Sequence, residues 1–221
     1  MDRFVVALLA ACALIGASLS SPPAPSHSPA EIASTSPAEV APAVSSAAPS
    51  EDERDEDAIA EAQILERFAV RHTALPERER RRLARVIVEE ARARDLAPDL
   101  VMAVIEVESA GYHLAESHVG ALGLMQLLPP TGKEMAERIG IEWKGPDTLF
   151  DPIINVRLGT AYLRELADKY GGDVNTALAA YNWGPGRIDR RLARGASVPR
   201  LYVEQVRRAA DRYAAIGSSR S

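Results

Sequence analysis

Residues 106–131 read EVESAGYHLAESHVGALGLMQLLPPT and join the end of a predicted helix to a glycine-rich apolar run. Apolar side chains recur every three to four residues over residues 98–109, which is the periodicity of an amphipathic helix. Three carboxylates, Glu106, Glu108 and Glu116, lie within eleven residues at this junction. Glu116 falls in a predicted loop, where a surface charge is the simplest interpretation. Two helical acids therefore remain as candidates for chemistry.

Helix phase separates these two acids, because successive residues of an α-helix turn by about 100°. The apolar side chains of this helix lie at positions i, i+3 and i+4, and Glu108 follows on the same stripe at i+7. These apolar residues are Val101, Val104 and Ile105. Glu106 points about 160° away from Glu108, which suits a solvated or structurally paired acid.

Glu108 is thus a carboxylate on an apolar stripe, which is costly unless the group has a partner or a function. Burial disfavours the charged form of a carboxyl group and raises its pKa. A carboxylic acid that stays protonated near neutral pH can donate its proton to a leaving group. Helix geometry leaves two interpretations of Glu108 open: a general acid, or a core acid that is ion-paired, for instance with an arginine.

The run after these acids combines permissive backbone with apolar side chains. Gly120 and Gly123 allow the backbone to come close to a ligand or to another helix. Gln126 is the one polar side chain between Ala121 and Leu128. A buried amide must find hydrogen-bond partners. Gln126 can bond the hydroxyl or N-acetyl groups of a sugar, or it can bond only backbone.

The 3.6-residue period continues from about residue 57 to the C-terminal region, and no convincing alternating strand pattern occurs in the sequence. Helices are predicted at about residues 57–71, 76–91, 98–109, 131–139, 152–170, 174–182, 188–194 and 199–213. Thr131, with Glu134 three residues later, predicts a capping box, and Gly140 predicts a helix stop. The predicted class is all-α, with one domain of about 160 residues.

The N-terminus has the pattern of a targeting segment. A charged start is followed by an apolar run from Phe4 to about Ala17 and then by small residues. This run is shorter than the ~20 apolar residues that span a bilayer, so residues 1–20 are predicted to be a secretory signal peptide, with an uncleaved apolar anchor as the alternative. The sequence LAAC ending at Cys12 resembles a lipobox, although the apolar run continues past it. Cys12 is either a lipidation site or a discarded part of the signal.

Composition divides the rest of the chain. Pro, Ala and Ser dominate residues 21–50, which lack the large apolar groups needed to offset the entropy of ordering. The acidic run EDERDED that follows is a solvated face or a helix start. The predicted organisation is a signal peptide at 1–20, a disordered Pro/Ala/Ser-rich linker with the acidic run at 21–57, N-terminal helices at 58–95 and the main helical domain at 96–215.

Charge and cysteine content exclude several function classes. The formal net charge is -5, and the run at residues 51–57 alone contributes -5. From Ala58 onward the chain holds 24 basic and 22 acidic side chains, so the folded part lacks the basic surplus typical of nucleic-acid binding. The one cysteine excludes a disulfide framework and a cysteine-based zinc site, and the four histidines form no helical metal pair.

Three segments carry a resemblance to a known family. The first contains Glu108-Ser109, Ser117 and the run GALGLMQLLPPT. The second, residues 149–188, contains the motif AYN-x-GPG, and the third is VPRLYVEQV at residues 198–206. Their sequence and order resemble the soluble lytic transglycosylase family over roughly residues 95–213. The resemblance implies a goose-lysozyme-like fold, a single lysozyme-like helical domain that acts as the catalytic domain at residues 96–215.

Specific roles follow from this resemblance. Glu108 matches the single catalytic acid, while Ser117, Gln126 and Tyr181 match residues that bind the sugar or orient the acid. The implied reaction cleaves the β-1,4 bond between N-acetylmuramic acid and N-acetylglucosamine and forms 1,6-anhydromuramic ends, without a metal or cofactor. Trp183 stands where alanine is usual, so it is either an added sugar-stacking surface or a packing residue.

Two alternative functions stay open: a muramidase on the same fold that uses water, and a non-catalytic glycan-binding scaffold of an envelope machine. The expected partner is the glycan strand of peptidoglycan rather than nucleic acid, with an envelope or secretion assembly as a further candidate. The protein is expected to be a monomer. It is expected to be exported to the periplasm, with outer-membrane anchoring if Cys12 is lipidated.

Overall fold

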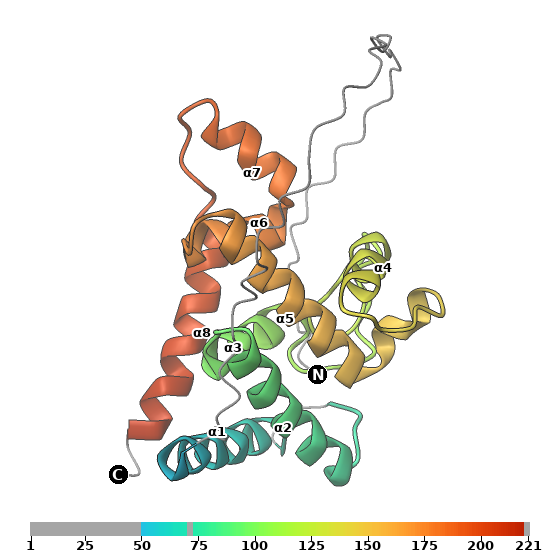
Figure 1. Ribbon diagram of the computed structural model, residues 1–221, viewed down its shortest axis with the longest axis vertical. Coiled ribbons are helices and arrows are strands. Elements are labelled where there is room, and N and C mark those ends of the chain that lie inside the picture. Colours follow the sequence, from blue (N-terminus) through green and yellow to red (C-terminus); the bar gives the residue numbers. More distant parts are fainter. Residues whose placement is uncertain (1–49, 70–72, 219–221) are drawn as a thin grey trace, which may run out of the picture.

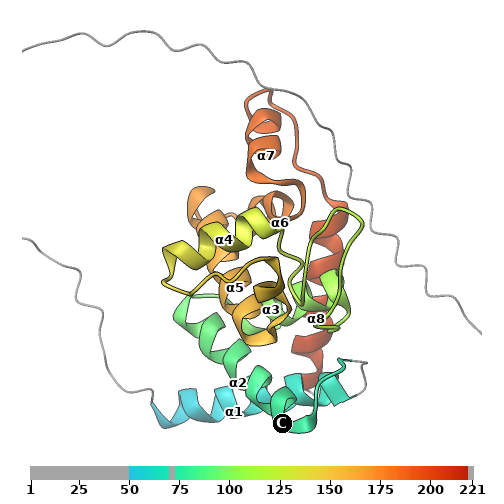
Figure 2. The same cartoon turned by 90° about the vertical axis from the view of Figure 1, so that its right-hand side faces the viewer.

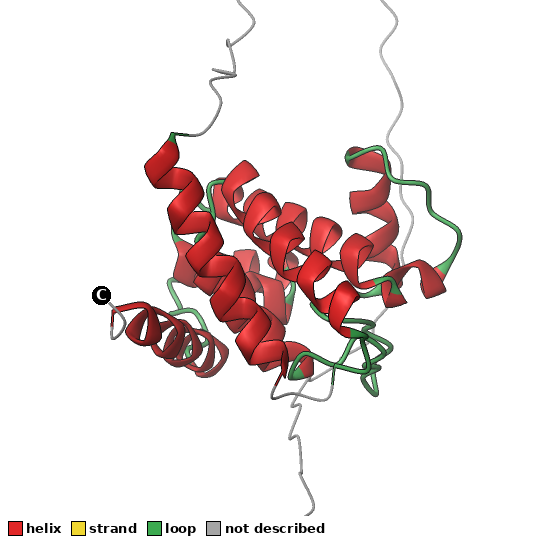
Figure 3. Cartoon of the chain, turned by 90° about the horizontal axis from the view of Figure 1, so that it is seen from below, coloured by secondary structure: helices red, strands yellow, loops and turns green. Residues whose placement is uncertain are grey.

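A computed structural model describes residues 50–69 and 73–218 of the chain (Figure 1). The described residues form α-helices joined by loops and one 3-10 helix, without a strand in those ranges (Figure 3). The elements are α1 (Glu51–Ala69), α2 (Glu77–Ala93), α3 (Pro98–Ser109), α4 (Pro129–Arg138), η1 (Pro146–Phe150), α5 (Pro152–Lys169), α6 (Val174–Trp183), α7 (Pro185–Leu192) and α8 (Leu201–Ser218). The predicted all-α class is confirmed.

Helix α3 lies at the centre of the larger hydrophobic core. Its residues 101–105 are all apolar and all buried, as expected for a helix segment that is enclosed by neighbours. Helix α8 packs along α3 most extensively, and α1 and α2 also contact it. The catalytic candidate Glu108 therefore sits at the end of a helix that contacts α1, α2 and α8.

A second, smaller core lies beside the first. It is formed by side chains from the connection 110–128, from α4, from η1 and from α5. Its buried members are Leu122, Leu127, Met135, Ala136, Leu149 and Leu158. Tyr162 and Tyr181 pack against both cores. Helices α4 and η1 thus form a lobe away from α1, α2 and α8 (Figure 1), and residues 110–128 connect α3 to it.

The N-terminal helix α1 begins at Glu51, so the prediction that a disordered linker extends to residue 57 is wrong. The acidic run forms the first two turns of α1, where negative side chains favour the positive end of the helix dipole. Asp57 also pairs with Arg92 of α2 at 3.0 Å. Both interpretations of this run agree with the structure, because it starts a helix and its residues 51–56 are exposed.

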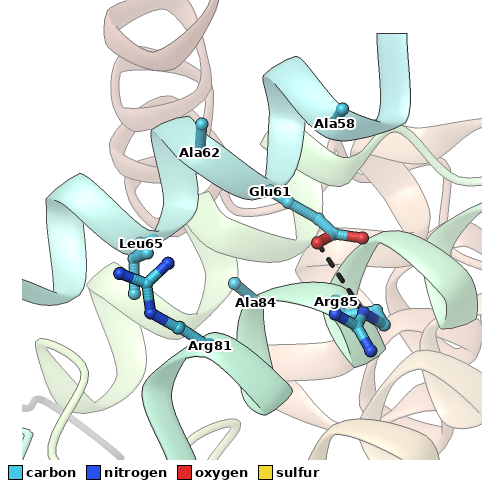
Figure 4. Close-up of a pocket in the computed structure, with 7 residues that line it drawn as sticks. All are labelled: Ala58, Glu61, Ala62, Leu65, Arg81, Ala84 and Arg85. Carbon is cyan, nitrogen blue, oxygen red and sulfur yellow. Dashed lines mark ion pairs between the residues drawn. The ribbon is translucent and has the colours of Figure 1, made fainter. Parts of the chain in front are cut away.

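Helix α1 packs against α2. Ala58, Ala62 and Leu65 of α1 and Ala84 of α2 lie at the edge of this contact, and Glu61 lies 3.8 Å from Arg85 (Figure 4). A shallow pocket of about 260 Å³ remains between the two helices. The surrounding charges are exposed to water, so this ion pair contributes little to stability.

The predicted start of the fourth helix is wrong. Helix α4 begins at Pro129 rather than Thr131, and no side chain caps its N-terminus. Two consecutive prolines, which lack an N–H donor and hold φ near −65°, occupy its first two positions instead. Glu134 pairs with Arg138 at 2.6 Å and takes no part in a capping box. The predicted stop at Gly140 is confirmed by its φ of +70°.

Two other predicted starts agree with the structure. The Asp151 carboxylate accepts hydrogen bonds from the second and third N–H groups of α5, and Asp173 does the same for α6. The predicted signal peptide, Cys12 and the linker up to residue 49 lie outside the described residues. Within residues 50–69 and 73–218, no helix combines the length and apolar content needed to cross a bilayer.

Candidate active site

Glu108 lies in the last turn of α3, just before the helix ends at Ala110 in a left-handed conformation. The Tyr202 hydroxyl, from the first turn of α8, donates a hydrogen bond of 2.6 Å to Oε1 of Glu108. Burial raises the pKa of Glu108 to about 7, and the Tyr202 hydrogen bond opposes this rise only in part. A substantial fraction of Glu108 is therefore protonated at neutral pH.

Glu106 lies on the other side of α3, as helix phase predicts. Its carboxylate accepts hydrogen bonds from Arg212 at 2.7 Å and from the Tyr213 hydroxyl at 2.5 Å. The Arg67 guanidinium of α1 lies 4.9 Å from the centre of the Tyr213 ring. Glu106 is thus a structurally paired acid that fastens α3 to α8. Glu116 is exposed, as expected.

A tight turn at residues 122–127 forms one wall of the site. Leu122 and Leu127 exchange backbone hydrogen bonds of 2.9 and 3.1 Å. Gln126 closes the turn with a positive φ of +49°, and its N–H donates to the Gly123 carbonyl at 3.2 Å. This strained closing residue is the one that carries the amide side chain.

Side chains from three different helices hold this turn in place. The Ser109 hydroxyl, next to the candidate acid, donates to the Leu124 carbonyl at 2.8 Å. The Tyr181 hydroxyl of α6 donates to the Met125 carbonyl at 2.7 Å. The third side chain is Asn155 of α5, which is completely buried. The turn is therefore fixed relative to the helix that bears Glu108.

Asn155 uses both ends of its amide. Its Nδ2 donates to the carbonyl oxygens of Leu122 at 3.0 Å and Leu149 at 2.8 Å. Its Oδ1 accepts the N–H of Met125 at 2.8 Å. Gly123 makes this approach possible, because a Cβ there would lie 2.2 Å from the Asn155 Nδ2 atom. The glycine also has a φ of +78°, which side-chain-bearing residues rarely adopt.

An open groove of about 530 Å³ runs along Glu108 and the connection after it. Ser117 and Gln126 line this groove with Glu108, so the structure brings three of the four predicted site residues together. The Ser117 hydroxyl accepts the N–H of Ala121 at 2.9 Å and shapes the loop. The apolar side chains of Leu122, Leu124 and Leu127 are buried and do not line the groove.

Gln126 bonds backbone with one end of its side-chain amide. Its Nε2 donates to two backbone carbonyls, those of Ala115 at 3.1 Å and Gly123 at 2.9 Å. Its carbonyl oxygen accepts no hydrogen bond from residues 50–69 or 73–218, and the residue lines the groove. The amide orientation is therefore fixed by backbone, and an acceptor is presented to a ligand.

Tyr181, the fourth predicted residue, acts from behind the turn. It packs at 5.4 Å, centroid to centroid, against the Tyr162 ring. Burial, followed by the charge of Glu108, raises the pKa of Tyr181 well above its usual value. Tyr181 therefore remains a proton donor to the Met125 carbonyl, and it supports the wall rather than lining the groove.

Two side chains that shape the site, Tyr202 and Asn155, are not among the site residues predicted from the sequence. Tyr202 lies within the third family-like segment, but its bond to Glu108 joins residues 94 positions apart. Asn155 is a polar residue within an otherwise apolar helix face, which is a signal for a buried hydrogen-bonding role. Neither partner was predictable from local spacing. In the part of the chain that the structure describes, no group of three His, Cys, Asp or Glu side chains could hold a metal ion.

This site geometry agrees with comparisons to known proteins. Residues 85–200 match the transglycosylase SLT domain, which is just over half of the chain. The chain belongs to the transglycosylase SLT domain family. The matched range includes Glu108, the turn at 122–127 and Tyr181, whereas Tyr202 and the rest of α8 follow it.

Relatives of this SLT chain include enzymes from bacteria and phage. It is 37% identical over 106 residues to the soluble lytic murein transglycosylase of Salmonella typhimurium, and the matched region covers 48% of this chain and 16% of that relative. It is 40% identical over 111 residues to the transglycosylase of Enterobacteria phage PRD1, which covers 44% of this chain and 38% of the relative. The matched part is thus well under half of either relative.

A solved structure supports the same conclusion about the fold. The X-ray structure of the lytic transglycosylase Slt from Pseudomonas aeruginosa, an inactive Glu-to-Gln variant, is similar with a TM-score of 0.54. The sequences are 35% identical, and the match covers 58% of this chain and 23% of that chain. The predicted lysozyme-like helical fold is confirmed for this SLT domain.

Proposed function

We propose that this protein is a peptidoglycan lytic transglycosylase that cleaves the β-1,4 bond between N-acetylmuramic acid and N-acetylglucosamine. The observation that supports it most strongly is Glu108, a carboxyl group with a pKa of about 7 at the wall of an open groove. Such an acid is still protonated when the enzyme works near neutral pH, and its conjugate base is strong enough to take a proton back.

The proposed reaction uses Glu108 twice. The protonated carboxyl group donates its proton to the glycosidic oxygen, and the N-acetyl group of the muramic acid stabilises the developing positive charge. The resulting carboxylate then removes the proton from the C6 hydroxyl of the muramic acid, whose oxygen bonds to C1. A 1,6-anhydromuramic end forms, and no water is consumed.

The neighbouring acids favour this single-acid scheme over the usual glycosidase scheme with two carboxylates. Glu106 is occupied by Arg212 and Tyr213, and Glu116 is exposed. Within the described residues, no neighbouring carboxylate contributes to the pKa of Glu108, whose rise is due to burial. A muramidase on the same fold, in which Glu108 activates water, is the second candidate.

The turn at residues 122–127 is proposed to bind the sugar next to the cleaved bond. The Gln126 carbonyl oxygen accepts a hydrogen bond from a sugar hydroxyl or N-acetyl N–H, and Ser117 lines the same groove. Tyr181 holds the wall, and Tyr202 orients Glu108. These contacts place the glycosidic oxygen against the carboxyl group.

We also propose that the protein acts on glycan strands in the periplasm as a monomer, with anchoring to the outer membrane if Cys12 carries lipid. Relatives are named both as soluble and as membrane-bound lytic murein transglycosylases. An envelope or secretion assembly is a further proposed partner.

The activity is tested by digesting purified peptidoglycan with the wild-type protein and with Glu108→Gln, and by weighing the released fragments. The wild type is expected to release fragments lighter by one water than hydrolytic products, and Glu108→Gln is expected to release fewer by roughly 10²- to 10⁴-fold. Fragments with reducing muramic ends would support the muramidase. Equal turnover by the two proteins would contradict the role of Glu108.

A further inference from the structure

Residues 183–201 project from the edge of the proposed active site. They begin two residues after Tyr181, whose hydroxyl bonds the groove turn at Met125. They end one residue before Tyr202, whose hydroxyl bonds Glu108. Both ends of this segment are therefore fastened to the site, and α7 between them stands out from the body of the molecule (Figures 1 and 2). We call residues 183–201 the arginine arm.

The arm is rich in arginine and poor in acid. It contains five arginines and a single acidic residue, Asp189. Asp189 is already occupied, because it lies 3.0 Å from Lys169 and accepts a hydrogen bond of 2.9 Å from Tyr170. The arginines are Arg187, Arg190, Arg191, Arg194 and Arg200. The positive charge of the arm is therefore largely uncompensated from within it.

Three of these guanidinium groups are available to a ligand. Arg190, Arg194 and Arg200 are exposed, and none of them has an ion pair with another described residue. Elsewhere the molecule pairs many of its arginines, as Arg138 with Glu134 and Glu165 shows. The arm thus gathers three exposed guanidinium groups without an ion pair within residues 190–200.

Hydrogen bonds within the arm hold α7 against the loop that follows it. Arg191 donates two hydrogen bonds, of 3.0 and 2.9 Å, to the Ser197 carbonyl in the loop after α7. The same guanidinium lies 5.8 Å from the centre of the Trp183 ring, which is 39% exposed. Helix α7 has eight residues and is about 12 Å long, and the segment that contains it starts next to Tyr181 and ends next to Tyr202.

We propose that the arginine arm binds the carboxylate groups of the peptides attached to the glycan strand. This inference rests on the proposed function, because it assumes that the strand in the groove is peptidoglycan. Those peptides leave the strand at its muramic acid residues and carry free carboxylates. Guanidinium groups bind carboxylates through short, charge-assisted and often two-pronged hydrogen bonds. The arm makes the enzyme prefer strands that still carry peptides over bare glycan.

A binding experiment separates this proposal from catalysis. The full-length Glu108→Gln protein, which leaves the polymer intact, is sedimented with purified peptidoglycan at low salt. Adding Arg190→Gln and Arg194→Gln is expected to weaken binding roughly fivefold or more, the effect of losing two exposed ion pairs. The matched control adds Arg78→Gln and Arg82→Gln, which remove the same charge from exposed positions on α2. This control is expected to bind as the Glu108→Gln protein does.

The same proteins are then tested on strands whose peptides an amidase has removed, and on phosphatidylglycerol vesicles. The arm variant and the control are expected to bind bare strands equally. The proposal would be overturned if the arm variant and the α2 control lost binding to intact peptidoglycan equally. It would also be overturned if the arm variant bound bare strands more weakly than the control, or if it lost binding only to vesicles. The product masses of the wild-type protein test the proposed activity independently. The proposed activity and the proposed role of the arm can therefore fail separately.

Discussion

The Tyr202 hydroxyl lies 2.6 Å from Oε1 of Glu108 and joins the first turn of α8 to the last turn of α3. Burial of Tyr202, together with the charge of Glu108, raises the pKa of this tyrosine well above its usual value, so it remains a donor. A donor to the carboxylate stabilises the ionised form of Glu108 and lowers its pKa. Tyr202 thereby limits how far burial raises the pKa of the proposed acid.

Replacing Tyr202 with phenylalanine is expected to raise the pKa of Glu108 above about 7. The alkaline limb of the pH–rate profile then moves to higher pH, because the acid keeps its proton longer. Stability is expected to fall by about 1 kcal/mol. The measurement is kcat/KM on glycan strands between pH 4 and pH 9.

Tyr213→Phe is the matched control for this change. It removes the same hydroxyl from the same helix, but its partner is Glu106 on the other side of α3. A comparable loss of stability with an unmoved pH profile is expected. If Tyr213→Phe shifted the alkaline limb as far as Tyr202→Phe does, the proposed specific effect on Glu108 would be wrong.

Glu108→Gln is expected to stabilise the protein above pH 7. The folded-state pKa of Glu108, about 7, exceeds its ordinary value of 4.5, so the folded protein binds the proton more tightly than the unfolded chain does. The stability from this group is fully present below pH 4.5 and is lost as the pH rises to about 7. Across this range the free energy of unfolding is expected to fall by about 2 kcal/mol, after allowance for partial exposure of the side chain. Urea unfolding of the wild type and of Glu108→Gln across this pH range measures this difference. Parallel curves of unfolding free energy against pH for the two proteins would contradict the prediction.

Two glycines of the connection 110–128 give a matched test of close backbone approach. Gly120 and Gly123 have φ values of +77° and +78°. A Cβ at Gly120 would meet nothing within 4 Å, whereas a Cβ at Gly123 would collide with Asn155 and the Leu149 carbonyl. Gly120→Ala is expected to cost about 1 kcal/mol and Gly123→Ala at least about 3 kcal/mol. Equal free energies of unfolding for the two variants would exclude this packing.

Asn155→Asp is expected to raise KM more than it lowers kcat, because the turn it holds carries Gln126 rather than Glu108. The carboxylate can still accept the Met125 N–H, but it cannot donate to the carbonyls of Leu122 and Leu149. A stability loss of about 2 to 4 kcal/mol at neutral pH follows. Protonation restores one donor, so the loss is expected to shrink below about pH 5.

Thr160→Val is the control on the same helix. Thr160 is also completely buried, but its hydroxyl bonds only carbonyls of its own helix, those of Val156 and Arg157. A small loss of stability with an unchanged KM is expected. Steady-state kinetics on defined glycan fragments measure both variants, and a similar rise in KM for Thr160→Val would show that general loosening of α5 explains the effect.

Helix periodicity was enough to predict the all-α class and the different environments of Glu106 and Glu108. It succeeded because α3 is strongly apolar and enclosed by neighbouring helices, so that helix phase alone separates its buried side chains from its paired ones. The caps at Asp151 and Asp173 were predictable because they depend on neighbours two and three residues away.

Other features depend on contacts that local sequence does not encode. Tyr202 and Asn155 acquire their roles from partners 94 and about 30 residues away. The capping box at Thr131 failed because two prolines before it already start the helix. The acidic run at 51–57 looked like linker, yet pairing with Arg92 and the helix dipole favour a helix there.

The central claim is that the Glu108 carboxylate removes a proton from the muramic C6 hydroxyl rather than from water. Digesting peptidoglycan with the wild-type protein in water enriched in heavy oxygen tests this directly. The account predicts anhydromuramic ends that contain no oxygen from the solvent. Newly formed muramic ends that carry the heavy oxygen would contradict it and identify a hydrolase.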